Sequence, residues 1–413
     1  MTYEESIKYL YHIAGFAKKS SLNDINYFLE QLNNPQEGLK FVHIAGTNGK
    51  GSVCAFLEAI LKEHKKTTAS FTSPHLIKVN ERIKLNGENV NDELFAKACT
   101  RVRKCVEEAK EKGIDEPSFF EMLFFMALLI MKEKHPDICL IETGMGGRYD
   151  ATNVLNPIAS VITSISMDHM EFLGETIEEI ATHKAGIIKA KVPVVTMQQE
   201  PEVSEIIEKE AIKKMSPIYD ISKDNLKFKE KATKYIDFLN TNAYDKRRDV
   251  RTNIAGAFQK SNLAMALCTA NIICQHTDAD KIYDALIKIR IPGRMEEISP
   301  GIIVDVSHNI QGMEGFVDTL EANFHGPKRI LFAASHKNEE EYMKNILKQI
   351  PGIETFYTVT IKNRRINKEE FQDVFRQMID QREKDMTCFV VGSFYLAGMA
   401  KEFMNQEEEE ERC

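Results

Sequence analysis

The sequence lacks the features that mark membrane, secreted and zinc-binding proteins. It has no run of eighteen apolar residues, and its longest apolar segment, 122–131, is followed by charged residues, so we expect no membrane span. The N-terminus has no basic segment followed by an apolar one, so we expect no secretory signal. None of the eight cysteines forms a C-x-x-C pair, which disfavours zinc and disulfide sites and favours a reducing cytoplasm.

An excess of positive charge is also missing. The formal net charge is −8 at pH 7, so we do not expect the chain as a whole to bind nucleic acid. Hydrophobic residues make up 43% of the chain and charged residues 28%, as in ordinary globular proteins. At 413 residues the chain is too long for one compact core, and two or three domains are expected.

Short apolar segments alternate with amphipathic ones along most of the chain. This pattern predicts an α/β fold with a mostly parallel sheet wound on both faces. The segment 291–294, Ile-Pro-Gly-Arg, interrupts the pattern, so we expect a first domain at 1–293 and a smaller Rossmann-like α/β domain at 294–413. In the first domain, 67–71, 137–142, 158–165 and 192–197 are expected strands, 72–91 a loop, and 226–239 antiparallel strands.

Residues 41–52 combine an apolar run with a glycine-rich turn, Phe-Val-His-Ile-Ala-Gly-Thr-Asn-Gly-Lys-Gly-Ser. Apolar residues at 53, 56, 57, 60 and 61 then predict an amphipathic helix. Strand, glycine turn and helix together form a phosphate-binding geometry, because backbone amides and the helix N-terminus face the anion. Lys50 is expected to reach the outer phosphates of a nucleotide, and Ser52 to contact a magnesium ion.

This stretch departs from the strict phosphate-binding pattern G-x-x-x-x-G-K-[ST]. Ile44 occupies the position of the first glycine, and Gly51 follows the lysine. A glycine-rich turn without a ligand therefore stays an alternative on the evidence of this stretch alone.

Three polar side chains follow predicted strands of the first domain. Ser73 follows 67–71, Glu142 ends 137–142, and His169 follows 158–165. Ligands of doubly wound sheets gather at the carboxyl ends of strands, so these groups could surround a magnesium ion next to a nucleotide. Magnesium prefers oxygen ligands, so a salt-bridged Glu142 and a hydrogen-bonded structural His169 remain as alternatives.

Several motifs occur in a fixed order. They are G-T-N-G-K-G-S at 46–52, T-S-P-H-L at 72–76, E-T-G-M-G-G-R-Y-D-A-T-N at 142–153, S-M-D-H with L-G at 166–174, and H-K-A-G-I-I-K at 183–189. Further motifs lie at 80–83, 256–262, 292–294 and 305–309. Together they cover nearly the whole chain, and they resemble the folylpolyglutamate synthase and dihydrofolate synthase family of the Mur ligase superfamily.

The resemblance implies an ATP-dependent amide ligase that adds L-glutamate to a folate through an acyl phosphate, with dihydropteroate as a second acceptor to consider. It implies that ATP is bound by Asn48, Gly49, Lys50, Gly51, Ser52, Asn262, Arg294 and Asp305, the last two from across the domain boundary. It implies that Mg²⁺, as two ions, is bound by Ser73, Glu142, His169 and Lys184. The catalytic residues that it implies are Lys50, His169 and Lys184.

Lys184 is implied to be carbamylated. Capture of carbon dioxide would turn its cationic amine into an anion with two oxygens, which could hold a second magnesium ion. Without the family, the favoured interpretation is a surface lysine on a helix that pairs with Glu178 or Glu179.

The expected partners are small molecules, namely ATP, L-glutamate and a folate or dihydropteroate, with no nucleic acid or membrane, and the chain is expected to be a monomer. A GTPase would need N-K-x-D, and the nearest segment, at 336–339, lacks both flanking residues. A non-catalytic P-loop nucleotide-binding protein and a Mur-type ligase of another carboxylate are the remaining alternatives. Residues 117–121 are either part of the pterin side or simply the start of a buried helix.

Overall fold

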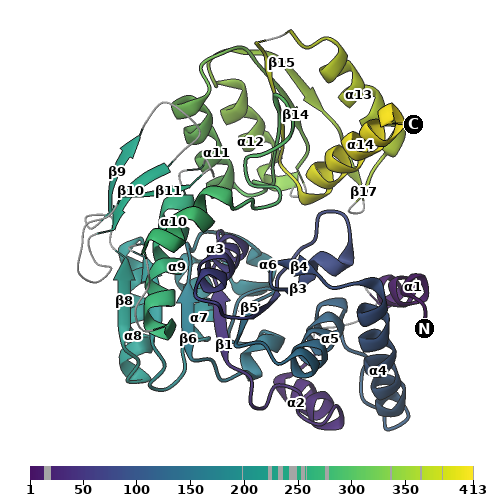
Figure 1. Cartoon of the computed structure of the whole chain (residues 1–413), viewed down its shortest axis with the longest axis vertical. Helices are drawn as coiled ribbons and strands as arrows, with labels where there is room; N and C mark the ends of the chain where they lie inside the picture. The colour runs from purple at the N-terminus through teal and green to yellow at the C-terminus, as the bar shows by residue number, and fades with distance from the viewer. Residues whose placement is uncertain are drawn as a thin grey trace. The chain divides into compact units, whose positions relative to one another are not determined.

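The computed structural model describes residues 1–13, 20–197, 199–221, 226–230, 236–240, 249–252, 256, 258–274, 279–334, 337–362, 365–383 and 385–412. The chain divides into two compact units (Figure 1). The first unit comprises Met1–Lys227, Asn240–Arg248 and Ser261–Leu286, and the second comprises Phe228–Leu239, Asp249–Lys260 and Ile287–Cys413.

The first unit is built on an eight-stranded sheet with the strand order β4-β3-β2-β5-β1-β6-β7-β8. Its strands are β1 (Phe41–Ala45), β2 (Thr68–Phe71), β3 (Ile83–Leu85), β4 (Glu88–Asn89), β5 (Ile138–Glu142), β6 (Ala159–Ile162), β7 (Val194–Met197) and β8 (Ile218–Ile221). All neighbouring pairs from β2 to β8 are parallel. The predicted α/β fold with a mostly parallel sheet is therefore confirmed.

Strand β1 lies at the centre of this sheet, between β5 and β6. Phe41 is opposite Cys139 on one side, and Val42 is opposite Ala159 on the other. All five residues of β1 are buried, which explains why the strand is a continuous apolar run with one histidine. The carboxyl ends of β5, β1 and β6 consequently lie side by side at one edge of the sheet.

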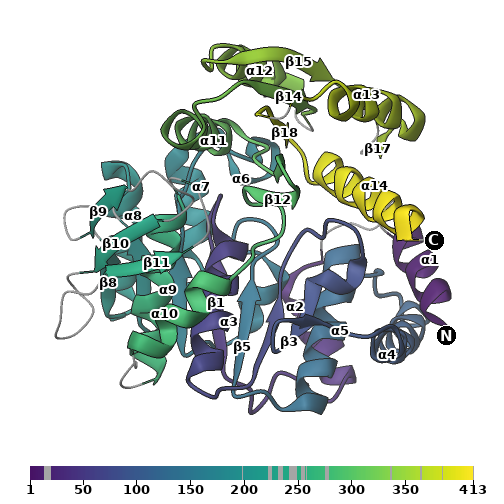
Figure 2. The same cartoon turned by 45° about the horizontal axis from the view of Figure 1, so that its top comes forward.

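The helices that lie wholly or mostly in the first unit are α1 (Tyr3–Ile13), α2 (Leu22–Gln31), α3 (Lys50–Glu63), α4 (Asp92–Lys110), α5 (Phe119–Lys134), α6 (Met170–Leu173), α7 (Ile177–Ala185), α8 (Pro201–Lys213), α9 (Gln259–Cys274) and α10 (Ala279–Lys288). Helices α1, α2, α4 and α5 share one apolar core with β1, β2 and β5, whereas α7 and α8 share another with β6 (Figure 2). In α5, the residues from 121 to 131 are all buried, as expected for a core helix. Among the described residues, no helix is long and apolar enough to cross a membrane.

Local sequence signals explain some element ends. A capping box begins α2, because the Ser21 hydroxyl accepts from the Asp24 amide at 3.2 Å and the Asp24 carboxylate accepts from the Ser21 amide at 3.1 Å. The prediction of a loop throughout 72–91 is wrong. This segment contains a 3₁₀ helix (Val79–Arg82) and the β3–β4 hairpin, whose turn at Asn86 and Gly87 has φ angles of 53° and 87°.

The second unit contains a five-stranded sheet with the order β12-β13-β18-β14-β15. Its strands are β12 (Glu296–Ser299), β13 (Ile302–Asp305), β14 (Lys328–Phe332), β15 (Ile353–Thr358) and β18 (Thr387–Val391), and its helices are α11 (Ile310–Asn323), α12 (Lys337–Lys348), α13 (Lys368–Asp380) and α14 (Phe394–Arg412). Only the edge strand β12 is antiparallel in this sheet. Short strands β16 (Ile361–Lys362) and β17 (Arg365–Ile366) form a hairpin, and β9 (Leu226–Glu230), β10 (Ile236–Asn240) and β11 (Asp249–Thr252) form a separate sheet.

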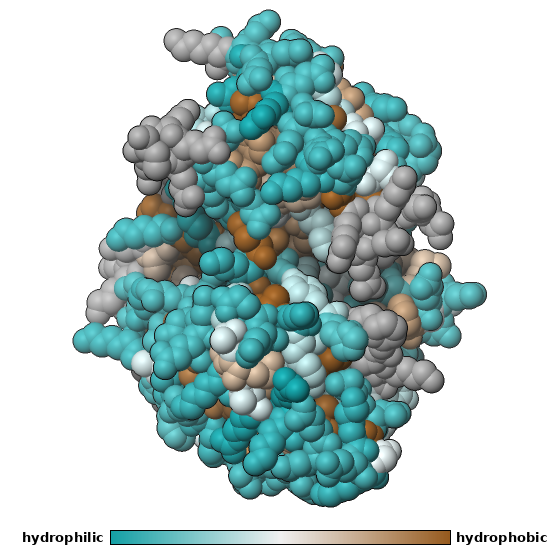
Figure 3. Space-filling view, turned by 90° about the vertical axis from the view of Figure 1, so that its right-hand side faces the viewer, coloured by the Kyte–Doolittle hydropathy of each residue, from teal (hydrophilic) through white to brown (hydrophobic). Residues whose placement is uncertain are grey.

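The surface drawn in Figure 3 is mostly hydrophilic, with apolar side chains in small groups. This fits helices such as α4 and α13, which bury one side and expose charged residues on the other.

Candidate nucleotide and metal site

The glycine turn lies between β1 and α3, at the carboxyl edge of the central strands. Gly46 has a φ of 150° and Gly49 a φ of 92°, both outside the usual range of other residues. A Cβ atom on Gly46 would lie 1.8 Å from Thr163 Oγ1, and one on Gly49 would lie 2.2 Å from Asn262 Oδ1. The turn therefore requires glycine at both positions, and Asn262 packs directly against it.

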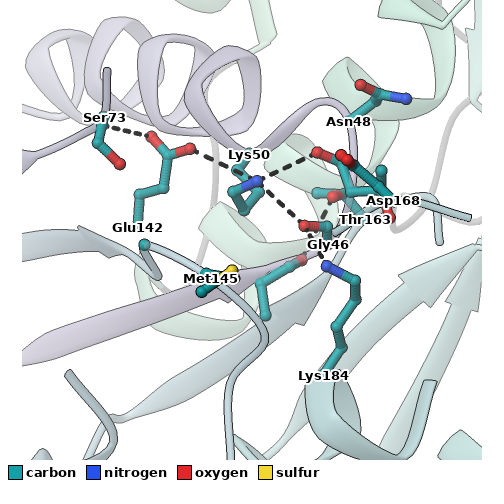
Figure 4. Close-up of polar contacts among 12 residues, drawn as sticks. Gly46, Asn48, Lys50, Ser73, Glu142, Met145, Thr163, Asp168 and Lys184 are labelled. Carbon is teal, nitrogen blue, oxygen red and sulfur yellow. Dashed lines mark hydrogen bonds and ion pairs between the residues drawn. The ribbon is translucent and has the colours of Figure 1, made fainter. Parts of the chain in front are cut away.

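The Lys50 side chain folds back over the glycine turn. Its ammonium group donates to the carbonyl oxygens of Gly46 at 3.0 Å and Thr47 at 3.1 Å, and lies 3.8 Å from Glu142 Oε1 (Figure 4). The cation thus lies at the mouth of the turn, where it could meet the outer phosphates of a bound nucleotide.

Glu142 reaches the same place from the end of β5. It is opposite Ile44 in the sheet and is 3% exposed. Its Oε2 accepts a hydrogen bond from the Ser73 amide at 3.2 Å. The structure therefore brings Ser73, Lys50 and Glu142 together. An ion pair of Glu142 does exist, and its partner is the lysine of the glycine turn.

Lys184, on α7, is buried and belongs to the same cluster. It is 3% exposed, and its ammonium group donates to the Gly46 carbonyl oxygen at 2.9 Å. The interpretation of Lys184 as a surface lysine is therefore wrong, and Glu179 instead accepts from the amides of Glu175 and Thr176. Burial, together with the nearby charge of Lys50, lowers the pKa of Lys184 from 10.5 to about 7.

His169 follows β6, the other neighbour of β1, and so lies at the same edge of the sheet. It occupies the position before α6 with a φ of 52°, and its Nε2 is 3.9 Å from Asp168 Oδ1. Within the part of the chain that the structure describes, no three His, Cys, Asp or Glu side chains are grouped closely enough to hold a metal ion. A magnesium ion held by Glu142 and His169 would thus need further oxygens, such as hydroxyl or phosphate oxygens.

Ser52 and Asn48 complete the turn. The hydroxyl of Ser52 is buried in the first turn of α3 and has no hydrogen-bond partner among the described residues. A buried hydroxyl without a partner is costly unless a ligand satisfies it, so this atom fits contact with a phosphate or its magnesium ion. Asn48 is 9% exposed, and its backbone forms a bridge with Ser164.

Asp150 organises the loop after Glu142, a role that the sequence motif alone did not reveal. Its Oδ2 accepts from the amides of Gly144 and Met145 at 3.1 and 3.0 Å, and its Oδ1 accepts from the amide and hydroxyl of Thr152. The only signal in the sequence was an aspartate eight residues beyond a strand-ending glutamate, within a glycine-rich motif.

Arg294 and Asp305 belong to the second unit. The Asp305 carboxylate accepts from the Met295 amide at 2.9 Å and from the amide and hydroxyl of Ser307 at 2.8 and 2.6 Å. The Arg294 guanidinium lies 5.9 Å from the centre of the Phe394 ring. Asp305 therefore fixes the backbone that carries Arg294.

Comparison with known proteins is consistent along the chain. Residues 44–270 match the Mur ligase middle domain. The chain is 33% identical to a dihydrofolate synthase/folylpolyglutamate synthase of Bacillus subtilis, over 85% of this chain and 83% of that protein. It is 27% identical to a folylpolyglutamate synthase of Lacticaseibacillus casei, over 97% and 98% of the two chains.

Solved structures show the same similarity. A complex of a folylpolyglutamate synthase (FPGS) with AMPPCP and folate superposes with a TM-score of 0.87 at 27% identity, over 98% of this chain and 100% of that one. The apo form of the L. casei enzyme gives a TM-score of 0.86 at 26% identity, with the same coverage. The chain therefore belongs to the folylpolyglutamate synthase/dihydrofolate synthase family of the Mur ligases.

Proposed function

We infer that this protein is an ATP-dependent ligase that joins the amino group of L-glutamate to a carboxylate of a folate. The observation that carries this inference is the cluster of Lys50, Glu142 and Lys184 around the glycine turn. It occurs in a chain that is similar over nearly its whole length to an enzyme solved with AMPPCP and folate.

We propose that the triphosphate of ATP binds at residues 48–52 with Asn262 beside the turn. Three observations support this proposal, namely the positive φ of Gly49, the buried hydroxyl of Ser52, which has no partner in the described part of the chain, and the packing of Asn262 against Gly49. Arg294 and Asp305 are proposed to contribute from the second unit, Arg294 through its charge and Asp305 by holding the Arg294 backbone.

Magnesium fits the same edge of the sheet. The proposed ligands are Ser73, Glu142 and His169, and the proximity of Ser73 to the Glu142 carboxylate supports the first two. When bound, the ion would neutralise charge on the phosphoryl oxygens during transfer. The charge of Lys50 would act on the same oxygens from the turn.

Lys184 is proposed to carry a carbamate that holds a second magnesium ion. Carbon dioxide reacts with a neutral amine, and a pKa of about 7 leaves much of this amine neutral near neutral pH. Unmodified Lys184 offers a metal ion no anionic oxygen and is a cation when protonated, whereas a carbamate would supply an anion with two oxygens.

The proposed reaction has two steps. A carboxylate oxygen of the folate attacks the γ-phosphorus of ATP, and the bond between this phosphorus and the β-phosphate oxygen breaks. ADP departs, and the folate carboxylate has become an acyl phosphate. The neutral amine of L-glutamate then attacks the acyl carbon, loses a proton and displaces phosphate. The protein contributes position and charge, so neither step needs a protein nucleophile.

The acceptor is proposed to be a folate that already carries glutamate, dihydropteroate, or both. The B. subtilis relative has a name that covers both activities, and the L. casei relative has a name that covers one. Phe120, whose ring lies 5.2 Å from that of Phe71 and fills the space beside Gly144, is the proposed pterin-side group of residues 117–121. A monomer is the proposed functional form.

The test is a phosphate-release assay with mass spectrometry of the products. Purified protein is given ATP, Mg²⁺ and L-glutamate with one of two acceptors. They are tetrahydrofolate, which already carries one glutamate, and dihydropteroate, which carries none. We expect phosphate and a product heavier by one glutamyl residue with at least one acceptor. If no acceptor yields a glutamylated product, the proposal is wrong.

A further inference from the structure

A glutamine outside the proposed site holds the segment that follows β6. Gln199, in the loop between β7 and α8, is partly buried. Its Oε1 accepts from the Ile165 amide at 2.6 Å, and its Nε2 donates to the Thr163 carbonyl oxygen at 3.3 Å. One side-chain amide thus supplies the donor and the acceptor that a neighbouring strand would otherwise supply to residues 163–165.

The same segment is bonded to the glycine turn through Thr47. The Thr47 amide donates to the Ser164 carbonyl oxygen at 2.7 Å, and the Thr47 hydroxyl exchanges hydrogen bonds with the Ser166 backbone at 3.0 and 3.1 Å. The Ser164 hydroxyl also donates to the Asn48 carbonyl oxygen at 3.3 Å. Two residues of the turn therefore take their position from residues 164–166.

Residues 163–166 pack directly against the glycine turn. Thr163 fills the space in which a side chain on residue 46 would lie (Figure 4). The Thr163 amide also donates to the Ala45 carbonyl oxygen at 2.8 Å. Protein interiors are close-packed, so a displacement of one group is transmitted to its neighbours. A shift of residues 163–166 would consequently move the backbone amides of the turn.

We propose that Gln199 is a positioning residue for nucleotide binding, which acts through residues 163–166 and Thr47 on the glycine turn. The inference rests on the proposed function in that it takes ATP as the ligand of this turn. Phosphate binding by backbone amides weakens when the amides move by a fraction of an ångström. Loss of the Gln199 side-chain amide should therefore weaken ATP binding, although Gln199 does not itself contact ATP.

The experiment compares Gln199→Leu and Gln199→Glu with the wild type by direct titration with ATP and Mg²⁺ and by steady-state kinetics. Leucine removes both hydrogen bonds, whereas glutamate keeps the acceptor for the Ile165 amide and loses the donor to Thr163. We expect about a tenfold weaker ATP affinity and higher KM for ATP in Gln199→Leu, a smaller effect in Gln199→Glu, and a KM for L-glutamate within about twofold of the wild type.

The matched control is Gln36→Leu. Gln36 is also partly buried and has one side-chain hydrogen bond, from Nε2 to Asn34 Oδ1 at 3.3 Å, but it precedes β1 and so lies at the opposite edge of the sheet. We expect this variant to bind ATP as the wild type does. Unchanged ATP affinity in Gln199→Leu, or equal losses for ATP and L-glutamate, would overturn the inference.

Two further outcomes are separated by this design. If Gln199→Leu does not fold, the ATP titration of Gln199→Glu decides the question, and wild-type affinity there counts against the inference. If the wild type binds ATP but ligates none of the acceptors, the proposed function fails, while the titrations still decide the role of Gln199.

Discussion

The ammonium groups of Lys50 and Lys184 converge on one atom, the carbonyl oxygen of Gly46, at 3.0 and 2.9 Å. Two lysine amines share one acceptor, and burial of Lys184 together with the charge of Lys50 lowers the pKa of Lys184 to about 7. The glycine turn is thus held by the same two side chains to which the proposed chemistry assigns a role.

The first prediction concerns the pH dependence of stability in buffer free of carbon dioxide. The pKa of Lys184 is about 7 in the folded protein and 10.5 in a model peptide. Between these values the unfolded chain binds a proton that the folded chain does not, so the free energy of unfolding rises with pH. Relative to Lys184→Met, the wild type should gain about 2 kcal/mol from pH 7 to pH 9, measured by urea unfolding. Parallel curves for the two proteins would contradict the lowered pKa.

The second prediction concerns Lys50. Lys50→Ala should reduce kcat by about a thousandfold or more, because a charge that stabilises the transferred phosphoryl group is lost. The fold should persist, since the side chain contacts the turn and Glu142 and does not belong to an apolar core. Phosphate release and circular dichroism measure the two effects. Lys62→Ala, at an exposed position of the same helix, is the control and should keep wild-type turnover.

The third prediction compares two glycines with positive φ. Gly46→Ala should destabilise the protein by about 3 kcal/mol, because a Cβ there overlaps Thr163 Oγ1 in addition to the backbone strain. Gly38→Ala, at φ 80° with no described atom within 4 Å of its Cβ, should cost only about 1 kcal/mol from strain. Chemical unfolding measures both. Equal losses would show that contact with Thr163 does not constrain the turn.

The fourth prediction concerns metal binding at Glu142. Glu142→Gln should raise the Mg²⁺ concentration needed for half-maximal activity by about tenfold or more, since a buried carboxylate ligand is lost. The measurement is the rate of phosphate release over a range of free Mg²⁺ at saturating ATP. Glu108→Gln, on the exposed face of α4, should leave the Mg²⁺ dependence unchanged. A Glu142→Gln enzyme with the wild-type Mg²⁺ requirement would remove Glu142 from the metal site.

The fifth prediction concerns Asp305. Asn has one acceptor oxygen in place of two, so Asp305→Asn must lose the hydrogen bonds to the Ser307 backbone and hydroxyl or the one to Met295. The KM for ATP should rise about tenfold as the Arg294 backbone loosens, and stability should fall by about 2 kcal/mol. Kinetics and thermal unfolding give the two values. Asp318→Asn, exposed on α11, is the control.

The sequence predicted the central strands well, because strands buried on both faces must be apolar along their whole length. The β3–β4 hairpin was missed, since strands of three and two residues leave almost no periodicity. Its residues Asn86 and Gly87 favour a turn, but a turn alone does not show that strands flank it. What pairs the hairpin with the sheet is β2, a neighbour that local sequence does not reveal.

Some residues of the candidate site could be named from the sequence, but the positions of others could not. Of the residues named from motif order, Lys50, Lys184 and Asn262 lie against the glycine turn, and Glu142 and, through it, Ser73 are joined to Lys50. Local patterns suggested a surface ion pair for Lys184, because Glu178 and Glu179 lie within reach on the same helix. Only the packing of α7, with Ile180, Ala181 and Ala185 in a core shared with β6, explains why Lys184 points inward. Gln199 carried no signal at all, since its partners are backbone atoms of another loop.

The central position of β1 has a consequence for synthesis of the protein. Phe41 pairs with Cys139 and Val42 with Ala159, so β1 leaves the ribosome long before either neighbour. Until those neighbours emerge, both edges of a strand that is apolar except for His43 are unpaired, which favours aggregation or capture by a chaperone. The nascent chain should therefore gain resistance to proteolysis in its first half only after β6, which ends at Ile162, has emerged from the ribosome.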